Sequence, residues 1–372
     1  MVLGESLKNV MSPRDVDNEA ILNAASANSK GRDVSLDVIK VISIYFVMII
    51  HVDAYSFYTF SKNWLPTIIV DSFARTAMPM FFMITGALLL NKEHSVRSII
   101  KRIRRVLVPL LVWSVIYIEY NLTWAPNPKQ SIAHFATEIL AGPVMYHLWY
   151  IYALIGLYIF MPVYSAFYQK CSRRVIVFTL IAWYIGCLLV PTLTTITDIK
   201  VGIGFDLPLF SGYLILGAFC YDAIVARNKN ASYFEVASLL SVWLVTVIAT
   251  AYFTYALSKH LGSPNSTFLD PRSPTAALCG AFLFPAICLL LHTGRKIPPK
   301  VYPIINHFSR TCFGVYLMHV LVLLFAQSKG VNSVMITPWV AIPLLSLALL
   351  VGCSIIVRGL QFIPAIRDIV PK

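Results

Sequence analysis

The sequence predicts an all-α, polytopic membrane protein with about ten transmembrane helices and both termini in the cytoplasm. Of its 372 residues, 58% are hydrophobic and only 13% are charged, and the mean hydropathy is +0.72. A soluble globular protein carries about 25% charged residues. The composition therefore excludes a soluble domain, and the apolar segments and the basic residues between them define the architecture.

Ten segments approach the roughly 20 apolar residues that a membrane-spanning helix needs. The segment at 106–122 is short, and Pro208 interrupts the segment at 206–224. In chain order, the segments are 38–60, 66–90, 106–122, 146–168, 175–192, 206–224, 233–257, 274–292, 310–328 and 338–358. They predict one transmembrane domain over 38–360, with a disordered cytoplasmic leader over 1–37 and a cytoplasmic tail over 361–372.

The distribution of basic residues predicts the orientation. With the N-terminus inside, the cytoplasmic segments carry 22 lysines and arginines, whereas the outer loops carry six. The six are Lys62, Lys129, Lys200, Lys259, Arg272 and Lys329. Because cytoplasmic loops are enriched in basic residues, this asymmetry predicts that both termini are cytoplasmic. It also accounts for the net charge of +13, so we expect membrane lipids rather than nucleic acid as the partner of these charges.

The first segment carries His51, which is separated from Lys40 by a stretch of ten apolar or weakly polar residues. In a helix this places the imidazole roughly 15 Å beyond the lysine. Ionisable groups at such depth are costly and mark functional sites. His51 is either a structural histidine bonded to a neighbouring helix or a general base. Asp53, two residues later, does not share the helical face of His51. A contact between Asp53 and His51 near the end of the helix is the alternative.

The second segment carries Arg75, together with Pro79. A guanidinium in a membrane must face the bundle interior or a wet cavity. Asp71 lies one helical turn earlier and predicts an ion pair with Arg75. Contact with a substrate is the alternative.

The third segment follows a basic run in which Arg102 and Arg105 share one helical face, as do Lys101 and Arg104. The run either sets the topology and contacts anionic lipids or binds the phosphates of a cytoplasmic anion. The ninth segment carries Tyr316 and His319 on one face near mid-depth, and the fourth opens with His147. The seven cysteines have no metal-site spacing, so we expect neither zinc nor disulfides.

Together, these segments resemble the membrane-bound acyltransferase family 3 from about Asp33 to Val320. The matching phrases are a basic residue, ten residues and a histidine (Lys40 to His51), the Arg75-TAMPMFFMITG phrase, an Arg-x-x-Arg pair (Arg102 and Arg105), the run HLWYIYALIGLY from His147, and Tyr316-LM-His319. The family more often has arginine where this chain has Lys40, which lacks the bidentate fork. The compact form resembles surface-glycan O-acetyltransferases, including that of enterobacterial common antigen.

The resemblance implies acetyl transfer from acetyl-CoA to a hydroxyl of a cell-surface polysaccharide or its lipid-linked precursor in a bacterial inner membrane. The implied catalytic residues are His51, Arg75, Tyr316 and His319, and the implied acetyl-CoA-binding residues are Lys40, Arg102, Arg104 and Arg105. Direct transfer and an acetyl-histidine intermediate both stay open. A transporter or flippase of a lipid-linked sugar or other small solute is the alternative function.

Overall fold

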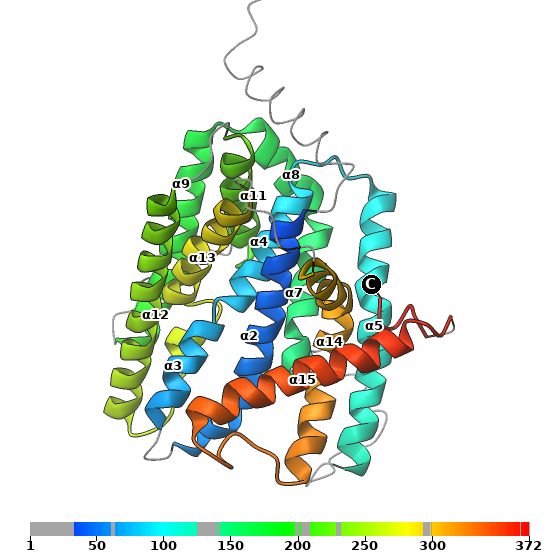
Figure 1. Ribbon diagram of the computed structural model, residues 1–372. Coiled ribbons are helices and arrows are strands. Elements are labelled where there is room, and N and C mark those ends of the chain that lie inside the picture. Colours follow the sequence, from blue (N-terminus) through cyan, green and yellow to red (C-terminus); the bar gives the residue numbers. More distant parts are fainter. Residues whose placement is uncertain are drawn as a thin grey trace, which may run out of the picture.

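The computed structural model describes residues 33–60, 64–124, 142–197, 209–227, 232–292, 300–364 and 366–371, together with 139, 201 and 298. Throughout these residues the regular structure is helical, with no strand (Figure 1). The elements are α2 (Val34–Thr59), α3 (Trp64–Ala74), α4 (Ala77–Leu89), α5 (Val96–Thr123), η1 (Tyr146–Leu148), α7 (Trp149–Ile159), α8 (Met161–Lys170), α9 (Arg173–Trp183), η2 (Tyr184–Leu189), α10 (Val190–Ile196), α11 (Ser211–Val225), α12 (Tyr233–Leu261), η3 (Thr267–Leu269), α13 (Pro274–His292), α14 (Tyr302–Ser328) and α15 (Pro338–Leu360).

Helices in all ten predicted segments confirm the polytopic membrane fold, but the segments are not ten uniform spans. Eight helices in the described residues are long and apolar enough to cross a membrane. A ninth span, Tyr146–Ile159 with Met161–Lys170, bends by 59°. The segment expected at 206–224 contains only Ser211–Val225, which has 15 residues. The short segment expected at 106–122 belongs instead to the 28-residue α5.

The first helix begins at Val34, earlier than the predicted residue 38. Asp33 caps it, since its carboxylate accepts hydrogen bonds from the Ser35 backbone N–H at 2.8 Å and from the Ser35 hydroxyl at 2.6 Å. The Tyr221 hydroxyl in α11 donates to the other carboxylate oxygen. The cap therefore also joins α2 to α11. Most of the predicted leader, 1–32, lies outside the described residues.

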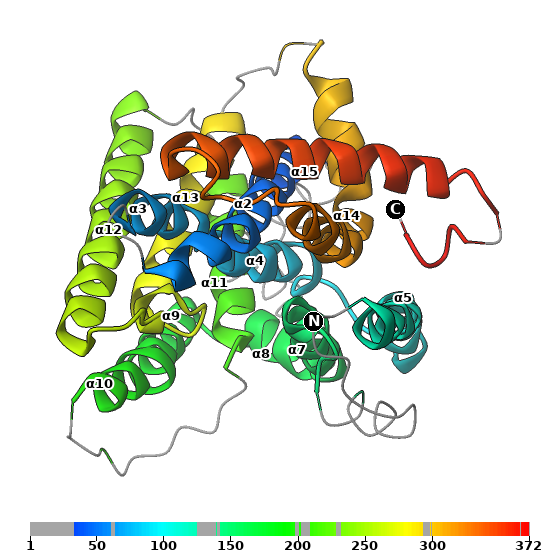
Figure 2. The ribbon, with the colours of Figure 1, turned by 90° about the horizontal axis from the view of Figure 1, so that it is seen from below.

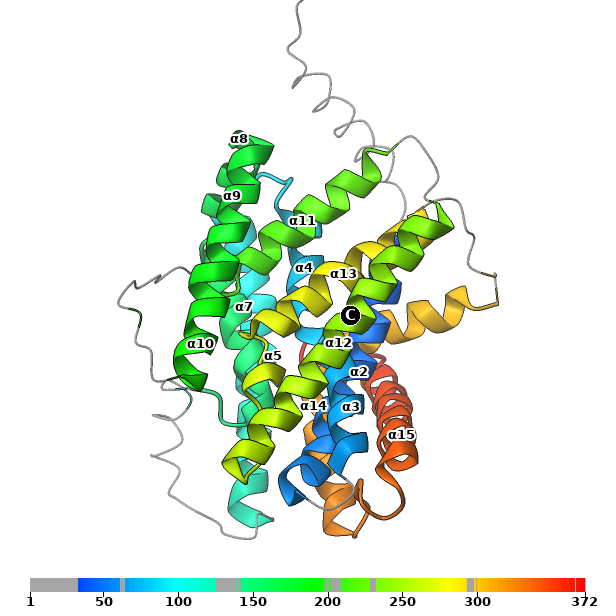
Figure 3. The same cartoon turned by 90° about the vertical axis from the view of Figure 1, so that its left-hand side faces the viewer.

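The core of the bundle is α2, which packs against α3, α4, α13, α14 and α15 (Figure 2). The last helix, α15, crosses α2 and α14 obliquely. Seen from the side, α9 and α10 lie along one flank and α15 along the other (Figure 3). His51 in α2 is consequently near the centre of the bundle.

Close packing of α4 against α11 depends on two glycines. A Cβ added to Gly86 would lie 1.9 Å from the Leu214 carbonyl oxygen, and one added to Gly217 would lie 2.2 Å from the Met83 carbonyl oxygen. Small residues allow helix backbones to approach in this way inside membranes. This contact fixes α4, and with it the break that precedes α4.

The predicted helix over 66–90 breaks at Arg75 and Thr76, which separate α3 from α4. Pro79 then lies in the first turn of α4, where its missing N–H removes no intrahelical hydrogen bond. The break places Arg75 at a helix junction rather than within a helix.

Residues after α15 fold back against the bundle. The Trp113 indole donates to the Ile369 carbonyl at 3.0 Å, and the Gln361 amide donates to the Val370 carbonyl at 3.1 Å. Val370 is fully buried. The predicted tail over 361–372 therefore packs on α5 and α15 in its described part, which the sequence did not indicate.

Candidate active site

Three histidines from three separate elements meet near the middle of the bundle. The ring centroid of His51 in α2 lies 4.9 Å from that of His319 in α14 and 6.2 Å from that of His147 in η1. The rings of His147 and His319 are 5.0 Å apart. The sequence identified His51 and His319 separately, and the fold brings them together.

His319 has a defined tautomer. Its Nδ1 atom lies 2.7 Å from the Tyr316 carbonyl oxygen and 3.2 Å from the Val315 carbonyl oxygen. Because carbonyl oxygens only accept, Nδ1 carries the hydrogen and Nε2 is left as an acceptor. Nε2 is buried and has no hydrogen-bond partner among the described residues. It can therefore accept an N–H from an approaching neighbour such as His51.

Tyr316 holds the short helix η1 against α14. Its hydroxyl donates to the backbone carbonyl of His147. Tyr117 in α5 supports the same place, since its hydroxyl donates to the Leu317 carbonyl at 2.8 Å and its ring centroid is 5.2 Å from that of His147. Tyr316 thus positions a site element, and its hydroxyl hydrogen is already engaged.

Arg75 forms the ion pair with Asp71 that the sequence indicated. Nε of Arg75 lies 2.7 Å from one carboxylate oxygen and a terminal guanidinium nitrogen lies 2.5 Å from the other. Asp71 is fully buried, whereas 19% of the Arg75 side chain is exposed. The carboxylate therefore holds the guanidinium in a fixed orientation, and part of the guanidinium still reaches open space.

That open space is a cavity of about 120 Å³. His51, Arg75 and Tyr316 line it, and His319 lies behind His51. The other lining residues are Val47, Ile50, Met78, Tyr146, His147, Trp149, Leu269 and Pro271. We call this space the histidine cavity. It combines an imidazole that can accept a proton with a cation that can face a developing negative charge.

Asp53 lies close to this centre but does not pair with His51. Its carboxylate is buried, and neither oxygen has a hydrogen-bond partner in the described part of the chain. Asp53 and Asp270 both act electrostatically on Arg75, in addition to Asp71. Asp71 makes the contact with the guanidinium, and the hydrogen bond between Asp53 and His51 that the sequence left open is not formed.

A second, larger pocket of about 600 Å³ lies beside α5 and the folded-back C-terminal residues. It contains Arg104 and Arg105, as well as Lys101 and Arg367. The remaining lining residues are Val108, Gln361, Asp368 and Pro371. We call it the basic pocket. It holds four cations against one carboxylate and so favours an anionic ligand.

The structure separates the predicted cofactor-binding residues into two groups. Arg102 is not among the residues lining the basic pocket. Its Nε is buried without a partner in the described residues, and its charge acts on Tyr158 of α7. Lys40 lies 3.8 Å from the Asp37 carboxylate in the first turns of α2. Arg102 and Lys40 therefore face the bundle, whereas Arg104 and Arg105 face the basic pocket.

Sequence reasoning did not assign His147 or Arg367 to a site. His147 opens a helical segment, where polar aromatic residues commonly anchor at the membrane interface. Its burial depends on η1 lying beneath Tyr316, a contact between residues far apart in sequence. Arg367 depends on the fold of the C-terminal residues. No group of three or more metal-binding side chains in the described residues could hold a metal ion.

A family model described as an acyltransferase domain matches residues 33–358, which is most of the chain. The matched region includes the histidine cavity and the α5 part of the basic pocket. No curated protein and no solved structure was found to match the chain.

Proposed function

Because the chain belongs to the membrane-bound acyltransferase family 3, we propose that it is an O-acetyltransferase of a bacterial inner membrane. The proposed donor is acetyl-CoA. The proposed acceptor is a hydroxyl of a cell-surface polysaccharide or its lipid-linked precursor. The family makes the chain an acyltransferase with several membrane-spanning helices; the acyl group, the acceptor and the particular membrane belong to the proposal.

The convergence of His51 and Arg75 on one buried cavity is the observation that carries this proposal. In the proposed reaction, His51 takes the proton of the acceptor hydroxyl while the hydroxyl oxygen attacks the thioester carbonyl carbon. The carbon–sulfur bond then breaks, and the imidazolium returns the proton to the departing thiolate. The products are the acetyl ester and free CoA.

Arg75 is suited to stabilise the tetrahedral intermediate. Its guanidinium is held by Asp71, so little reorganisation is needed when negative charge develops on the carbonyl oxygen. His319 and Tyr316 have positioning roles, His319 through its free Nε2 beside His51 and Tyr316 through the His147 carbonyl. The same geometry serves a two-step route in which His51 first accepts the acetyl group.

The basic pocket is the proposed site for the phosphates of CoA. Arginine forks match phosphate oxygens, and Arg104, Arg105 and Arg367 lie together there with Lys101. A volume of about 600 Å³ accommodates the nucleotide end of the donor. Arg102 and Lys40 face inward from the same end of the bundle, which suits contact with the pantetheine arm.

The test measures release of CoA by the purified protein in detergent. The protein is supplied with acetyl-CoA and with oligosaccharides from the envelope of the bacterium that naturally produces it. His51→Ala is expected to lower the rate by about 10²- to 10⁴-fold, the usual contribution of a general base. The exposed His260, at the end of α12, provides the matched control His260→Ala, which should leave the rate unchanged.

Two results would contradict parts of this proposal. Full CoA release by His51→Ala would show that His51 is not the base, even in an active acetyltransferase. A wild-type protein that releases no CoA would instead favour the transporter or flippase.

A further inference from the structure

We propose that a pocket between α10 and the segment that leads into α13 binds the carbohydrate acceptor. The pocket has a volume of about 710 Å³. Its lining residues come mainly from η2 and α10 and from the 264–273 segment. Among them are Thr194, Thr195, Asp270, Arg272 and Ser273. This acceptor pocket rests on the acetyl-transfer proposal and adds a binding site to it.

The lining of the acceptor pocket suits a neutral, polyhydroxyl ligand. The hydroxyls of Thr194 and Thr195 donate to carbonyls of their own helix at 2.8 Å, which leaves their oxygens facing the pocket as acceptors. The one carboxylate, Asp270, and the one guanidinium, Arg272, form a bidentate pair with both distances 2.8 Å. The charges therefore balance among the described lining residues, and the pair still offers both donors and acceptors for sugar hydroxyls.

An anionic ligand fits this lining less well. The basic pocket holds an excess of cations, whereas the acceptor pocket has no such excess among its described residues. The described lining residues are mainly small or hydroxyl-bearing side chains and Asn265, which suit hydrogen bonds with sugar hydroxyls. The two pockets thus differ as the two substrates do.

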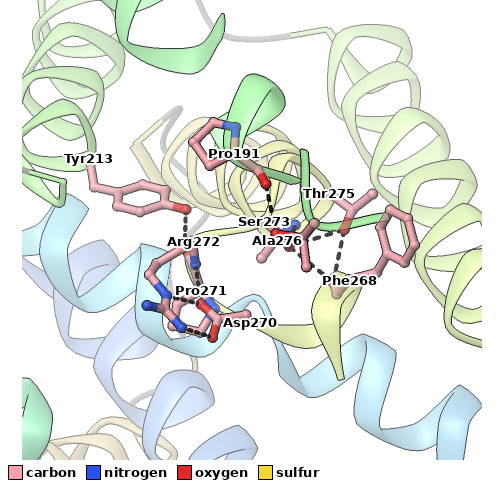
Figure 4. A network of polar contacts seen from close by, with 10 residues as sticks. Pro191, Tyr213, Phe268, Asp270, Pro271, Arg272, Ser273, Thr275 and Ala276 are labelled. Carbon is pink, nitrogen blue, oxygen red and sulfur yellow. Dashed lines mark hydrogen bonds and ion pairs between the residues drawn. The ribbon is translucent and has the colours of Figure 1, made fainter. Parts of the chain in front are cut away.

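Only one short segment separates the acceptor pocket from the histidine cavity. Leu269 and Pro271 line the histidine cavity, whereas Asp270, Arg272 and Ser273 line the acceptor pocket. Alternate residues face opposite sides because the backbone is extended at Asp270, with φ −68° and ψ 138°. The Tyr213 hydroxyl donates to the Pro271 carbonyl at 2.6 Å and holds the segment in place (Figure 4).

The position of the acceptor pocket also matches an acceptor that arrives from the side opposite to acetyl-CoA. Helix α5 begins near the end of the bundle where α12 begins, whereas the 264–273 segment follows the other end of α12 (Figures 1 and 3). Asp270 acts electrostatically on Arg75 across the dividing segment. A sugar bound against the Asp270–Arg272 pair would therefore be next to the reacting centre.

Thr195→Trp tests the acceptor pocket. Thr195 is exposed and faces the pocket, so the indole fills the binding space without replacing a core residue. Leu193→Trp is the matched control, since Leu193 is an exposed residue of the same helix that is not among the lining residues.

The first measurement is binding of oligosaccharides from the host cell envelope to the purified protein, by native mass spectrometry. We expect Thr195→Trp to weaken binding by about tenfold or more, as a pocket misfit does, and Leu193→Trp to leave it unchanged. Glycan binding by Thr195→Trp at the wild-type level would overturn the proposal. So would equal weakening in both tryptophan variants, or wild-type protein that binds no oligosaccharide.

The second measurement separates this inference from the acetyl-transfer proposal. Acetyl-CoA binding by Thr195→Trp should stay at the wild-type level, because the basic pocket lies elsewhere; its loss would point to a general structural defect and overturn the assignment. If Thr195→Trp alone weakens glycan binding while the wild-type protein releases no CoA, that result would support the acceptor pocket and contradict the proposal of acetyl transfer.

Discussion

Arg75 forms an ion pair with Asp71 and has a proposed role in catalysis, and one pair of substitutions can separate the two. Replacing Arg75 by Gln removes the guanidinium and leaves the Asp71 carboxylate fully buried and uncompensated. Breaking a buried ion pair in this way costs about 3–5 kcal/mol of stability. Replacing both residues, as Arg75→Gln with Asp71→Asn, removes the unpaired charge as well. We therefore expect the double variant to regain at least half of the lost stability.

A surface ion pair provides the comparison for this stability measurement. Arg227 and Glu235 lie 2.7 Å apart, but their side chains are 38% and 39% exposed. Exposed pairs contribute about 0–1 kcal/mol. Thermal unfolding in detergent should thus rank Arg227→Gln close to wild type, the Arg75/Asp71 double variant lower, and Arg75→Gln lowest.

Activity decides whether Arg75 also acts on the substrate. If the guanidinium faces the developing oxyanion, the double variant recovers stability but not turnover. Loss of one such donor costs about 10²- to 10³-fold in kcat. A double variant with recovered stability and wild-type CoA release would refute the catalytic role and leave Arg75 as a structural ion-pair partner. A double variant no more stable than Arg75→Gln would refute the reasoning about the buried charge.

Three further predictions concern other parts of the molecule. Arg105→Gln should raise KM for acetyl-CoA with little change in kcat, because Arg105 lines the basic pocket. The control is Arg97→Gln, at an exposed position of the same helix outside that pocket, which should leave KM unchanged. Equal effects on KM would indicate that these arginines only set the membrane topology. Tyr316→Phe should cost about 1–3 kcal/mol in thermal unfolding because it leaves the His147 carbonyl without its donor, and an unchanged unfolding temperature would contradict that contact. Gly217→Ala should destabilise the protein by about 1–3 kcal/mol or more, since its Cβ meets backbone rather than a movable side chain, and wild-type stability would show that α4 and α11 separate freely.

Hydropathy located the helices well because each span must bury its backbone polar groups within one apolar segment. It did not find the break at Arg75 and Thr76, since the apolar residues continue through it and Pro79 alone does not say where a helix restarts. It also overestimated the length of the segment that became α11. Such boundaries depend on how neighbouring helices pack.

The site was predictable residue by residue but not as an assembly. His51, Arg75 and His319 stood out because ionisable groups are expensive in a membrane. Their meeting depends on how α14 and the junction between α3 and α4 pack against α2, and His147 joins them because η1 packs beneath Tyr316. Helical spacing correctly paired Lys101 with Arg104 on the basic pocket. It could not show that Arg102 faces α7 while Arg105 faces the C-terminal residues.

The size of the histidine cavity constrains how the proposed substrates reach each other. Its volume of about 120 Å³ is much smaller than the volumes of the other two pockets, about 600 Å³ and about 710 Å³. The histidine cavity is thus suited to the reacting groups, an acetyl thioester and one hydroxyl, and the larger pockets to the nucleotide and the sugar. The bulk of each substrate must therefore stay outside, and the two larger pockets lie where that bulk would rest. In this arrangement, His51 need not carry the acetyl group across the bundle. In the proposed reaction, the pantetheine arm and the acceptor hydroxyl each enter from their own side and meet at the imidazole.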